Sequence, residues 1–440
     1  MKLFILNLSC YCLLAFGACQ NQQKAPASES TAQVPPTDSS IQLPPGFKAI
    51  VVADSLGGRA RHIAVNKNGD IYVQMSREFG GNGLAALRDT TGDGKADIIA
   101  YFGNHTGTGM EISGNYLYCS SDVSVFRYEL KEGQLLPDEN SKVLLIGGFD
   151  DQREHSSKSL ALDGAGNIYV NIGAPSNACQ VENRTAGSPG QDPCPLLETH
   201  AGIWKFDANK IAQQRKDGTR YASGIRNTVG LTWNTATNSL FVMQHGRDQL
   251  SQFWPKLFTD EQNAELPAEE MFQVNEGDFC GWPYCYFDPL QNKKVLAPEY
   301  GGDGKKTGRC DQAKTPLVAF PAHMGPNDII FYDGQLFPEK YRGGAFIAFH
   351  GSWNRAPLEQ KGYYVVFVPF KDGKVAGDWE AFADGFAGVK PIPSPGDAKH
   401  RPTGLAIGPD GALYVSDSVK GKIWKIIVNR DEELGMRNEE

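Results

Sequence analysis

The sequence predicts an all-β protein folded as a six-bladed β-propeller, and two observations support this prediction. Glycine supplies 49 of the 440 residues and proline another 26, a composition that favours many turns and short strands over long helices. One pattern also recurs along the chain: an apolar stretch, a turn rich in Gly or Asn, and a second short apolar run. Six such units between residues 43 and 430 would each supply one blade of a closed ring. A pair of packed β-sheets is the alternative architecture.

Each repeated unit is predicted to be a β-hairpin, because turn residues separate two runs rich in β-forming side chains. The clear copies are Ile63–Val73, Met110–Cys119, Leu160–Val170, Leu231–Val242 and Leu405–Val415, with a weaker copy from Ile330. The runs at 124–130, 202–207 and 421–427 resemble later strands of the same units. Cys119 stands where most copies have Val, which favours a buried free thiol.

The N-terminal residues indicate export. Lys2 precedes an apolar run that is too short to span a bilayer, and Gly17 and Ala18 come directly before Cys19. We therefore interpret residues 1–18 as a lipoprotein-type signal peptide and 19–42 as a flexible tether from an acylated Cys19. Plain secretion is the alternative. Residues 43–430 would form the propeller and 431–440 a charged tail, in a protein lipid-anchored to a bacterial membrane and facing the periplasm or cell surface.

Charge and cysteine content narrow the function classes. The net charge of −8 gives no general attraction to nucleic acid. No C-x-x-C-H motif is present, so no covalently attached haem is expected. An exported protein can form disulfides, but the sequence does not fix which of its cysteines pair. The candidates are Cys179, Cys194, Cys280, Cys285 and Cys310. A structural zinc site at Cys280 and Cys285 is a less favoured alternative.

The propeller geometry predicts where polar side chains gather. In each blade the first strand lines the central channel and the second runs back, so residues before the first and after the second share one end of the ring. The residues before first strands include His105, His155, Arg226, Asn227, His323, His400 and Arg401. Those after second strands include Gln244, His245, Arg247, His350, Asn354 and Arg355. We expect a ring of imidazole and guanidinium groups at this mouth, suited to a small ligand with several negative charges. A metal site of three histidines is the rival interpretation.

Two long insertions and one acidic loop are further candidates for a functional role. Long insertions at 174–200 and 250–312 could form the walls of a pocket at the mouth. The loop of Asp89, Asp93 and Asp97 is similar to a calcium loop, but Ala100 stands where such a loop needs a bidentate Glu. A solvated hairpin turn is therefore the favoured interpretation of that loop.

Several motifs resemble the glucose/sorbosone dehydrogenase family, in its L-sorbosone dehydrogenase-like branch. They are GIRNTVGLTWN from residue 224, GDFCGWPY from 277, HGSWNR from 350 and RPTGLAIGPDGALYVSD from 401, and the resemblance extends over nearly all of 43–428. Members of this family are six-bladed propellers that use pyrroloquinoline quinone (PQQ) and Ca²⁺.

The resemblance implies a role for each matching residue. It makes His155 the general base and Arg226, next to Asn227, the group that polarises the quinone oxygen. It assigns calcium to the backbone of Gly246 and Arg247, where glucose-oxidising members have Gly-Pro after a Gln. Further cofactor-binding residues would be His245, Arg247, His350, Arg355 and Arg401.

The resulting expectation is PQQ-dependent oxidation of an aldose, a sorbosone-like aldehyde or a related polyol. Electrons would leave to a separate acceptor, a cytochrome or a quinone. The alternatives are a calcium-dependent hydrolase of lactonase type and a non-catalytic propeller that binds glycans or proteins.

Overall fold

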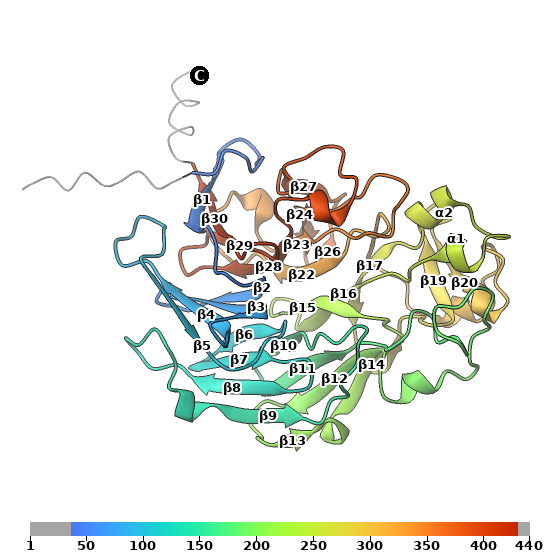
Figure 1. Cartoon of the computed structure of the whole chain (residues 1–440), viewed down its shortest axis with the longest axis horizontal. Helices are drawn as coiled ribbons and strands as arrows, with labels where there is room; N and C mark the ends of the chain where they lie inside the picture. Colours follow the sequence, from blue (N-terminus) through green and yellow to red (C-terminus); the bar gives the residue numbers. More distant parts are fainter. Residues whose placement is uncertain (1–36, 430–440) are drawn as a thin grey trace, which may run out of the picture. The chain divides into compact units, whose positions relative to one another are not determined.

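Residues 37–429 of the computed structural model form six β-sheets that radiate as the blades of a propeller (Figure 1). The innermost strands of the sheets gather at the centre of the view, and the outer strands lie towards its edge. The predicted all-β fold with six blades is therefore confirmed, and two packed sheets do not describe it.

In five blades the three innermost strands are consecutive along the chain, and the outer strands come later in the sequence. The first contains β2 (Ala60–Val65), β3 (Ile71–Phe79), β4 (Asn82–Arg88) and β5 (Ile98–Phe102). The second contains β6 (Met110–Ser113), β7 (Tyr116–Ser120), β8 (Val125–Glu129), β9 (Val143–Gly147) and the short β13 (Gln213–Gln214). The third contains β10 (Leu160–Leu162), β11 (Asn167–Ile172), β12 (Gly202–Asp207), β14 (Thr219–Ser223) and β18 (Asp278–Phe279). The fourth contains β15 (Thr228–Asn234), β16 (Ser239–Gln244), β17 (Glu269–Val274) and β21 (Val318–Phe320). The fifth contains β22 (Pro326–Phe331), β23 (Ala345–Phe349), β24 (Tyr364–Val368) and β27 (Glu380–Ala383).

The sixth blade closes the ring by joining the two ends of the described chain. It contains β28 (Pro402–Ile407), β29 (Leu413–Asp417), β30 (Ile423–Val428) and β1 (Phe47–Ala53). β1 pairs antiparallel with β30, from Phe47 opposite Val428 to Ala53 opposite Ile423. A propeller closed in this way leaves few unpaired strand edges.

The remaining elements are short. Two small hairpins are β19 (Cys285–Asp288) with β20 (Lys293–Leu296), and β25 (Phe370–Lys371) with β26 (Lys374–Val375). The α-helices of the described residues are α1 (Leu250–Phe253) and α2 (Asp260–Glu265). Single 3₁₀ turns occur at 139–141, 195–198, 215–217, 298–300, 308–312, 339–341 and 395–397. Figure 1 shows α1, α2, β19 and β20 together at one side of the ring, outside the six blades.

The predicted hairpins are the two innermost strands of the blades. The first and last residues of all five clear copies face each other across their hairpins, as Ile63 faces Val73 and Leu405 faces Val415. The alternation of buried apolar residues and turn residues thus fixed both the strands and their register. The weaker copy from Ile330 is the β22–β23 hairpin.

Neighbouring innermost strands pack closely around the hub, each against the next in chain order and β28 against β2. A Cβ on Gly230 of β15 would lie 2.9 Å from the backbone of Asp328 in β22, so only glycine permits this approach. Four innermost strands also carry a register shift near their first residues, for example between Ala60 and Ile63. Such bulges add twist and redirect side chains at the mouth of the channel.

The six cysteines within residues 37–429 form two disulfides and two free thiols. Cys179 pairs with Cys194, and Cys285 pairs with Cys310. Cys119 is buried and free, as predicted, and Cys280 is also buried and free.

The acidic loop forms a turn in which Asp89 accepts from the backbone N–H groups of Thr91, Gly92 and Gly94. The side chain of Asp97 accepts from Thr90 in the same way.

The ends of the chain bear on the predicted domain boundaries. The signal peptide, the acylated Cys19 and the tail at 431–440 lie outside the described residues. Residues 37–42, which the sequence assigned to the tether, contact the propeller: Asp38 accepts hydrogen bonds from Lys422 Nζ (2.8 Å) and Trp424 Nε1 (3.0 Å). Between residues 37 and 429, no helix is long and apolar enough to cross a bilayer.

Candidate active site at the mouth of the propeller channel

A cavity of about 200 Å³ occupies the hub and is lined by all six innermost strands. Most of its lining is aliphatic, but His62, Glu111 and Asp328 also face it. His62 Nε2 lies 2.9 Å from the backbone oxygen of Asn327 and 3.9 Å from Asp328 Oδ1. The hub is therefore a narrow channel with carboxyl groups in an apolar wall.

Burial in this wall, with Asp328 nearby, raises the pKa of Glu111 from 4.5 to about 8. The folded state thus holds this proton more tightly than the unfolded chain, so the stability that Glu111 contributes at low pH is lost as the pH rises from 4.5 through 8. Glutamine at this position does not titrate. The free energy of unfolding should be measured with urea at pH 5 and at pH 8. Between these pH values that of Glu111→Gln should rise by roughly 2 kcal/mol relative to that of the wild type. A stability difference that is the same at both pH values would contradict this assignment.

His155 lies in the loop between β9 and β10, at the end of the ring where the innermost strands begin. Its Nδ1 is 2.5 Å from the backbone oxygen of Ala174. Because a carbonyl oxygen only accepts, Nδ1 carries the ring proton and Nε2 keeps its lone pair. Burial, and then the nearby Arg226, lowers the pKa of His155 to about 3. The imidazole is therefore neutral near pH 7 and can accept a proton at Nε2.

The backbone around His155 is held in an unusual conformation. His155 has a φ of 54°, a region that non-glycine residues rarely adopt. The side-chain amide of Gln152 fixes this turn by donating to the backbone oxygens of Glu154 (2.7 Å), His155 (3.0 Å) and Gly173 (3.0 Å). Gly173 approaches so closely that a Cβ there would lie 2.7 Å from both His155 and Asn227. The strain is local and is stabilised by these contacts.

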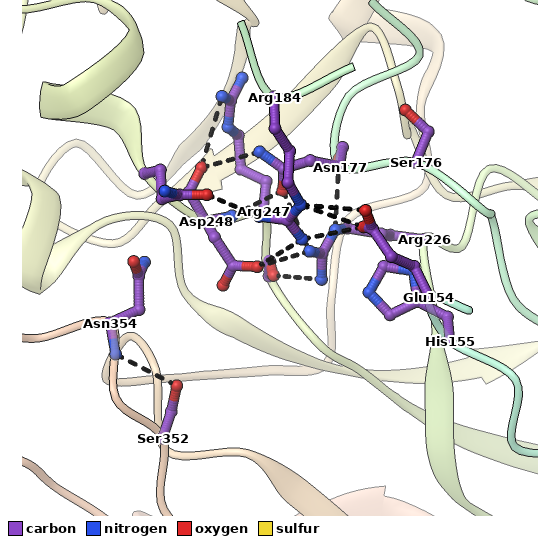
Figure 2. Close-up of polar contacts among 12 residues, drawn as sticks. Glu154, His155, Ser176, Asn177, Arg184, Arg226, Arg247, Asp248, Ser352 and Asn354 are labelled. Carbon is purple, nitrogen blue, oxygen red and sulfur yellow. Dashed lines mark hydrogen bonds and ion pairs between the residues drawn. The ribbon is translucent and has the colours of Figure 1, made fainter. Parts of the chain in front are cut away.

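Arg226, which precedes β15, lies beside His155, and its guanidinium donates four hydrogen bonds in the folded chain (Figure 2). Its Nη2 contacts Asp248 Oδ2 at 2.7 Å and Asn177 Oδ1 at 3.0 Å, its Nε donates to Asn177 O, and its Nη1 donates to Gly246 O at 2.9 Å. Arg184 approaches the same carboxylate and binds Glu154. Burial would raise the pKa of Asp248, but Arg226 and other cationic neighbours lower it to about 2.

The residues next to Arg226 complete this part of the site. Asn227 is buried, and its Oδ1 accepts from Asn171 Nδ2 at 3.1 Å. His245 Nε2 is 2.8 Å from the backbone oxygen of Pro326, which leaves the lone pair on Nδ1. Burial lowers the pKa of His245 to about 4, so this ring is also neutral near pH 7.

The predicted calcium ligand Gly246 is engaged on both sides of its peptide unit. Its N–H donates to Glu269 Oε2 at 2.8 Å, and its carbonyl oxygen accepts from the Arg226 guanidinium. Calcium prefers oxygen ligands with negative charge around them. A guanidinium fixed on this carbonyl oxygen repels a divalent cation at the same position, so the site does not fit calcium.

Two predicted cofactor ligands, Arg247 and Arg355, bind carboxylates of the 250–312 insertion. Arg247 pairs with Glu299, which also accepts from Trp254 Nε1 at 2.9 Å. Arg355 pairs with Glu265 at 2.5 Å and donates to the backbone oxygens of Ala264 and Glu359. In this conformation both arginines fasten the insertion to the blades.

Arg401 and His350 lie together across the mouth. Arg401 donates from Nε to His350 O (3.0 Å) and from Nη2 to Gly351 O (2.8 Å), while Nη1 has no hydrogen bond within residues 37–429. His350 Nε2 is 2.6 Å from Ser418 Oγ. Burial and then Arg401 lower the pKa of His350 well below its usual range.

Arg61 of β2 is a site residue that the sequence analysis missed. It is half-buried, and its side chain makes one hydrogen bond, from Nε to Thr108 Oγ1 at 3.3 Å. Within the described part of the chain no carboxylate lies within ion-pair distance of it. Burial, together with Arg401, lowers the pKa of Arg61 to about 10 despite the opposing effect of Asp122. Arg61 lies just before the first clear hairpin, Ile63–Val73. It therefore stands before a predicted first strand, the position from which other residues at the mouth were predicted.

The predicted ring is therefore partial. His245 acts on the charge of both His155 and His350, and these histidines are also influenced by Arg226, Arg61 and Arg401. His105 instead lies against Cys119 and Lys142 in the second blade. His323 is buried against the backbone of Asn263 and Leu266, and His400 pairs with Asp417. No group of three metal-ligating residues that could hold an ion occurs within 37–429.

Comparison with known proteins places the chain in a family. The family model described as TrAA12-like matches residues 41–429. The chain belongs to the TrAA12-like family. This assignment agrees with the six-bladed architecture and extends over the whole described propeller.

Other proteins are similar to this family member at low identity. A PQQ-dependent sugar dehydrogenase from Hypocrea jecorina is 22% identical over 410 residues, covering 88% of this chain and 86% of that protein. A calcium structure of a Trichoderma reesei enzyme of carbohydrate-active enzyme family AA12 superposes with a TM-score of 0.70 and 20% identity, covering 88% and 97% of the two chains. The holo PQQ domain of a pyranose dehydrogenase from Coprinopsis cinerea gives 0.69 and 19%, covering 88% and 97%. At these identities the solved structures show a common fold.

Proposed function

We propose that the chain is a PQQ-dependent dehydrogenase that oxidises a sugar at the mouth of the propeller channel. The single observation that supports this most strongly is Arg61, a half-buried guanidinium that has no carboxylate within ion-pair distance among residues 37–429. Asp122 and Asp328 act on this guanidinium without forming an ion pair with it. A partly desolvated cation without a direct ion pair is unfavourable, so its presence points to a negatively charged ligand. The similar sugar dehydrogenase of Hypocrea jecorina, named as PQQ-dependent, agrees with this ligand class.

The donor set fits PQQ, which carries three carboxylates and an ortho-quinone. Arg61 and the free Nη1 of Arg401 would hold carboxylates, since guanidinium groups bind them in forked geometry. Asn227 lies beside Arg226 with Nδ2 available to a ligand, and His245 and His350 would line the cofactor. Arg247 pairs with Glu299 through Nη1 and keeps an Nε–H that has no partner among residues 37–429, whereas Arg355 would have to release Glu265.

Bound PQQ would supply the quinone that accepts a hydride. The protein would supply the base: His155 Nε2 takes the proton of the sugar hydroxyl as the carbon–hydrogen bond breaks. Ala174 O holds the opposite ring nitrogen and so keeps the correct tautomer. The partly buried carboxylate of Asp248 favours the imidazolium that forms, because it lowers the energy of positive charge nearby. Aldoses, sorbosone-like aldehydes and related polyols all offer the required hydroxyl or hydrated carbonyl group.

The cellular setting is part of the same proposal. We propose that residues 1–18 direct export, that an acylated Cys19 anchors the protein to a membrane, and that electrons pass to a separate cytochrome or quinone. A protease-protection and detergent-partitioning assay on cells that express the full chain would test the anchor. Recovery in the aqueous phase without acyl modification would contradict it.

A dye-reduction assay with a substrate panel tests the activity. Protein loaded with PQQ should reduce an artificial electron acceptor with at least one aldose, aldehyde or polyol. The same preparations should be offered lactones with Ca²⁺ alone, because a hydrolase of this architecture would act without PQQ. Lactone hydrolysis without any sugar oxidation would reject the dehydrogenase in favour of the hydrolase.

A further inference from the structure

Arg226 donates a hydrogen bond to the backbone oxygen on which the family resemblance places a calcium ion. The Nη1 to Gly246 O distance is 2.9 Å. We propose that this chain binds PQQ without calcium, and that the Arg226 guanidinium supplies the positive charge that a metal ion would otherwise bring. The inference rests on the proposed function and concerns the same site.

The guanidinium is fixed in place by a network rather than by one contact. Nε and Nη2 bind the backbone and side-chain oxygens of Asn177 at 3.2 and 3.0 Å, and Nη2 also binds Asp248 at 2.7 Å (Figure 2). Asn177 is itself held by two hydrogen bonds to the backbone of Asp248, each of 2.9 Å, and Trp282 Nε1 donates to Asn177 O. Arg226 is only 3% exposed. Moving it away from Gly246 would break several buried charge-assisted hydrogen bonds.

The surrounding charges do not compensate a divalent ion. Asp248, two positions after Gly246, is shared by Arg226 and Arg184. Glu154, the next carboxylate of this network, is bound by Arg184. Glu269 is hydrogen-bonded to the backbone N–H groups of Gly246 and Gly325. Asp248 and Glu154 are therefore both bound by guanidinium groups, and a metal ion on Gly246 O would stand directly beside the fixed guanidinium of Arg226. The Arg247 side chain does not compete for this position, because it pairs with Glu299.

A charged donor next to the cofactor can do part of what a metal does. A guanidinium aimed at a developing negative charge stabilises it electrostatically, as a metal ion would, and needs no ligand exchange. Arg226 has one Nη1 hydrogen that the described contacts do not use, and this hydrogen is available to an acceptor at the site. Arg226 can therefore supply both the positive charge and the contact with the cofactor that a calcium ion would otherwise supply.

Calorimetric titration of PQQ into the chelator-treated full propeller tests the inference. We expect the dissociation constants with excess chelator and with millimolar Ca²⁺ to agree within about threefold. A requirement for Ca²⁺ that exceeds about tenfold in affinity would overturn the inference and leave the PQQ proposal standing. Absence of PQQ binding under both conditions would overturn the proposed function and this inference with it.

A pair of variants identifies the residue responsible. Arg226→Gln removes the guanidinium and frees Gly246 O, so PQQ affinity in chelator should fall about tenfold or more and should be partly restored by Ca²⁺. Arg184→Gln is the matched control, because Arg184 pairs with the same Asp248 but does not contact Gly246. Its PQQ affinity should stay independent of Ca²⁺. Thermal melting should show that both variants fold. If the PQQ affinity of both is then unaffected by Ca²⁺, Arg226 does not take the place of a calcium ion.

Discussion

Replacing His155 by glutamine will lower the turnover of the PQQ-loaded protein by about 100- to 10,000-fold, the range that a general base contributes. Glutamine keeps a hydrogen-bond donor for Ala174 O but has no nitrogen lone pair to take the substrate proton. Single-turnover reduction of the bound cofactor, followed by absorbance, measures this step directly. PQQ affinity should change little, because binding does not use the proton acceptor.

Two comparisons make this result specific. His105→Gln changes a histidine that lies against Cys119 and Lys142, away from the mouth, and should retain turnover. Because the pKa of His155 is held near 3, wild-type turnover should not decline through protonation of this ring until the pH approaches that value. A His155→Gln variant that keeps more than about a tenth of wild-type turnover would remove His155 from the mechanism.

Replacing Arg61 by alanine will weaken PQQ binding by about 10- to 100-fold, as expected for the loss of one half-buried, charge-assisted hydrogen-bonding group. Turnover at saturating PQQ should fall much less, since Arg61 would hold the cofactor rather than the reacting atoms. Arg61→Lys should recover part of the affinity but not all of it, because an ammonium group cannot bind a carboxylate in a forked geometry.

The control for Arg61 is an arginine of similar charge outside the mouth. Arg309 forms an exposed ion pair with Asp192, so Arg309→Ala should leave PQQ affinity within about twofold. Fluorescence or calorimetric titration gives these constants. Equal loss of affinity in both variants would mean that general charge, and not a site at Arg61, attracts the cofactor.

The blades could be predicted because their signal is local. In each copy the turn residues and the two apolar runs lie within about a dozen residues, so pairing partners such as Leu160 and Val170 are visible in one stretch of sequence. Strand direction alone predicted that residues before the first strands and after the second strands would lie at the same end of the ring. In the structure His245 acts on the charge of both His155 and His350.

Side-chain partners could not be predicted, because they come from insertions without a repeating pattern. Arg247 and Arg355 occupy positions at the mouth, but Glu299 and Glu265 turn them towards the 250–312 insertion. The disulfide between Cys285 and Cys310 likewise depends on how that insertion folds back on itself. The contact from Arg226 to Gly246 O required the position of Asn177, which lies in the other insertion.

The most direct test of the proposed function is spectrophotometric titration of PQQ into the chelator-treated propeller, repeated with the Arg61→Ala variant. The site described above predicts saturable binding at one PQQ per chain, with a perturbed quinone absorbance and a clear loss of affinity in the variant. Binding that is absent, or that does not saturate and is unaffected by Arg61→Ala, would contradict a quinone cofactor at this mouth.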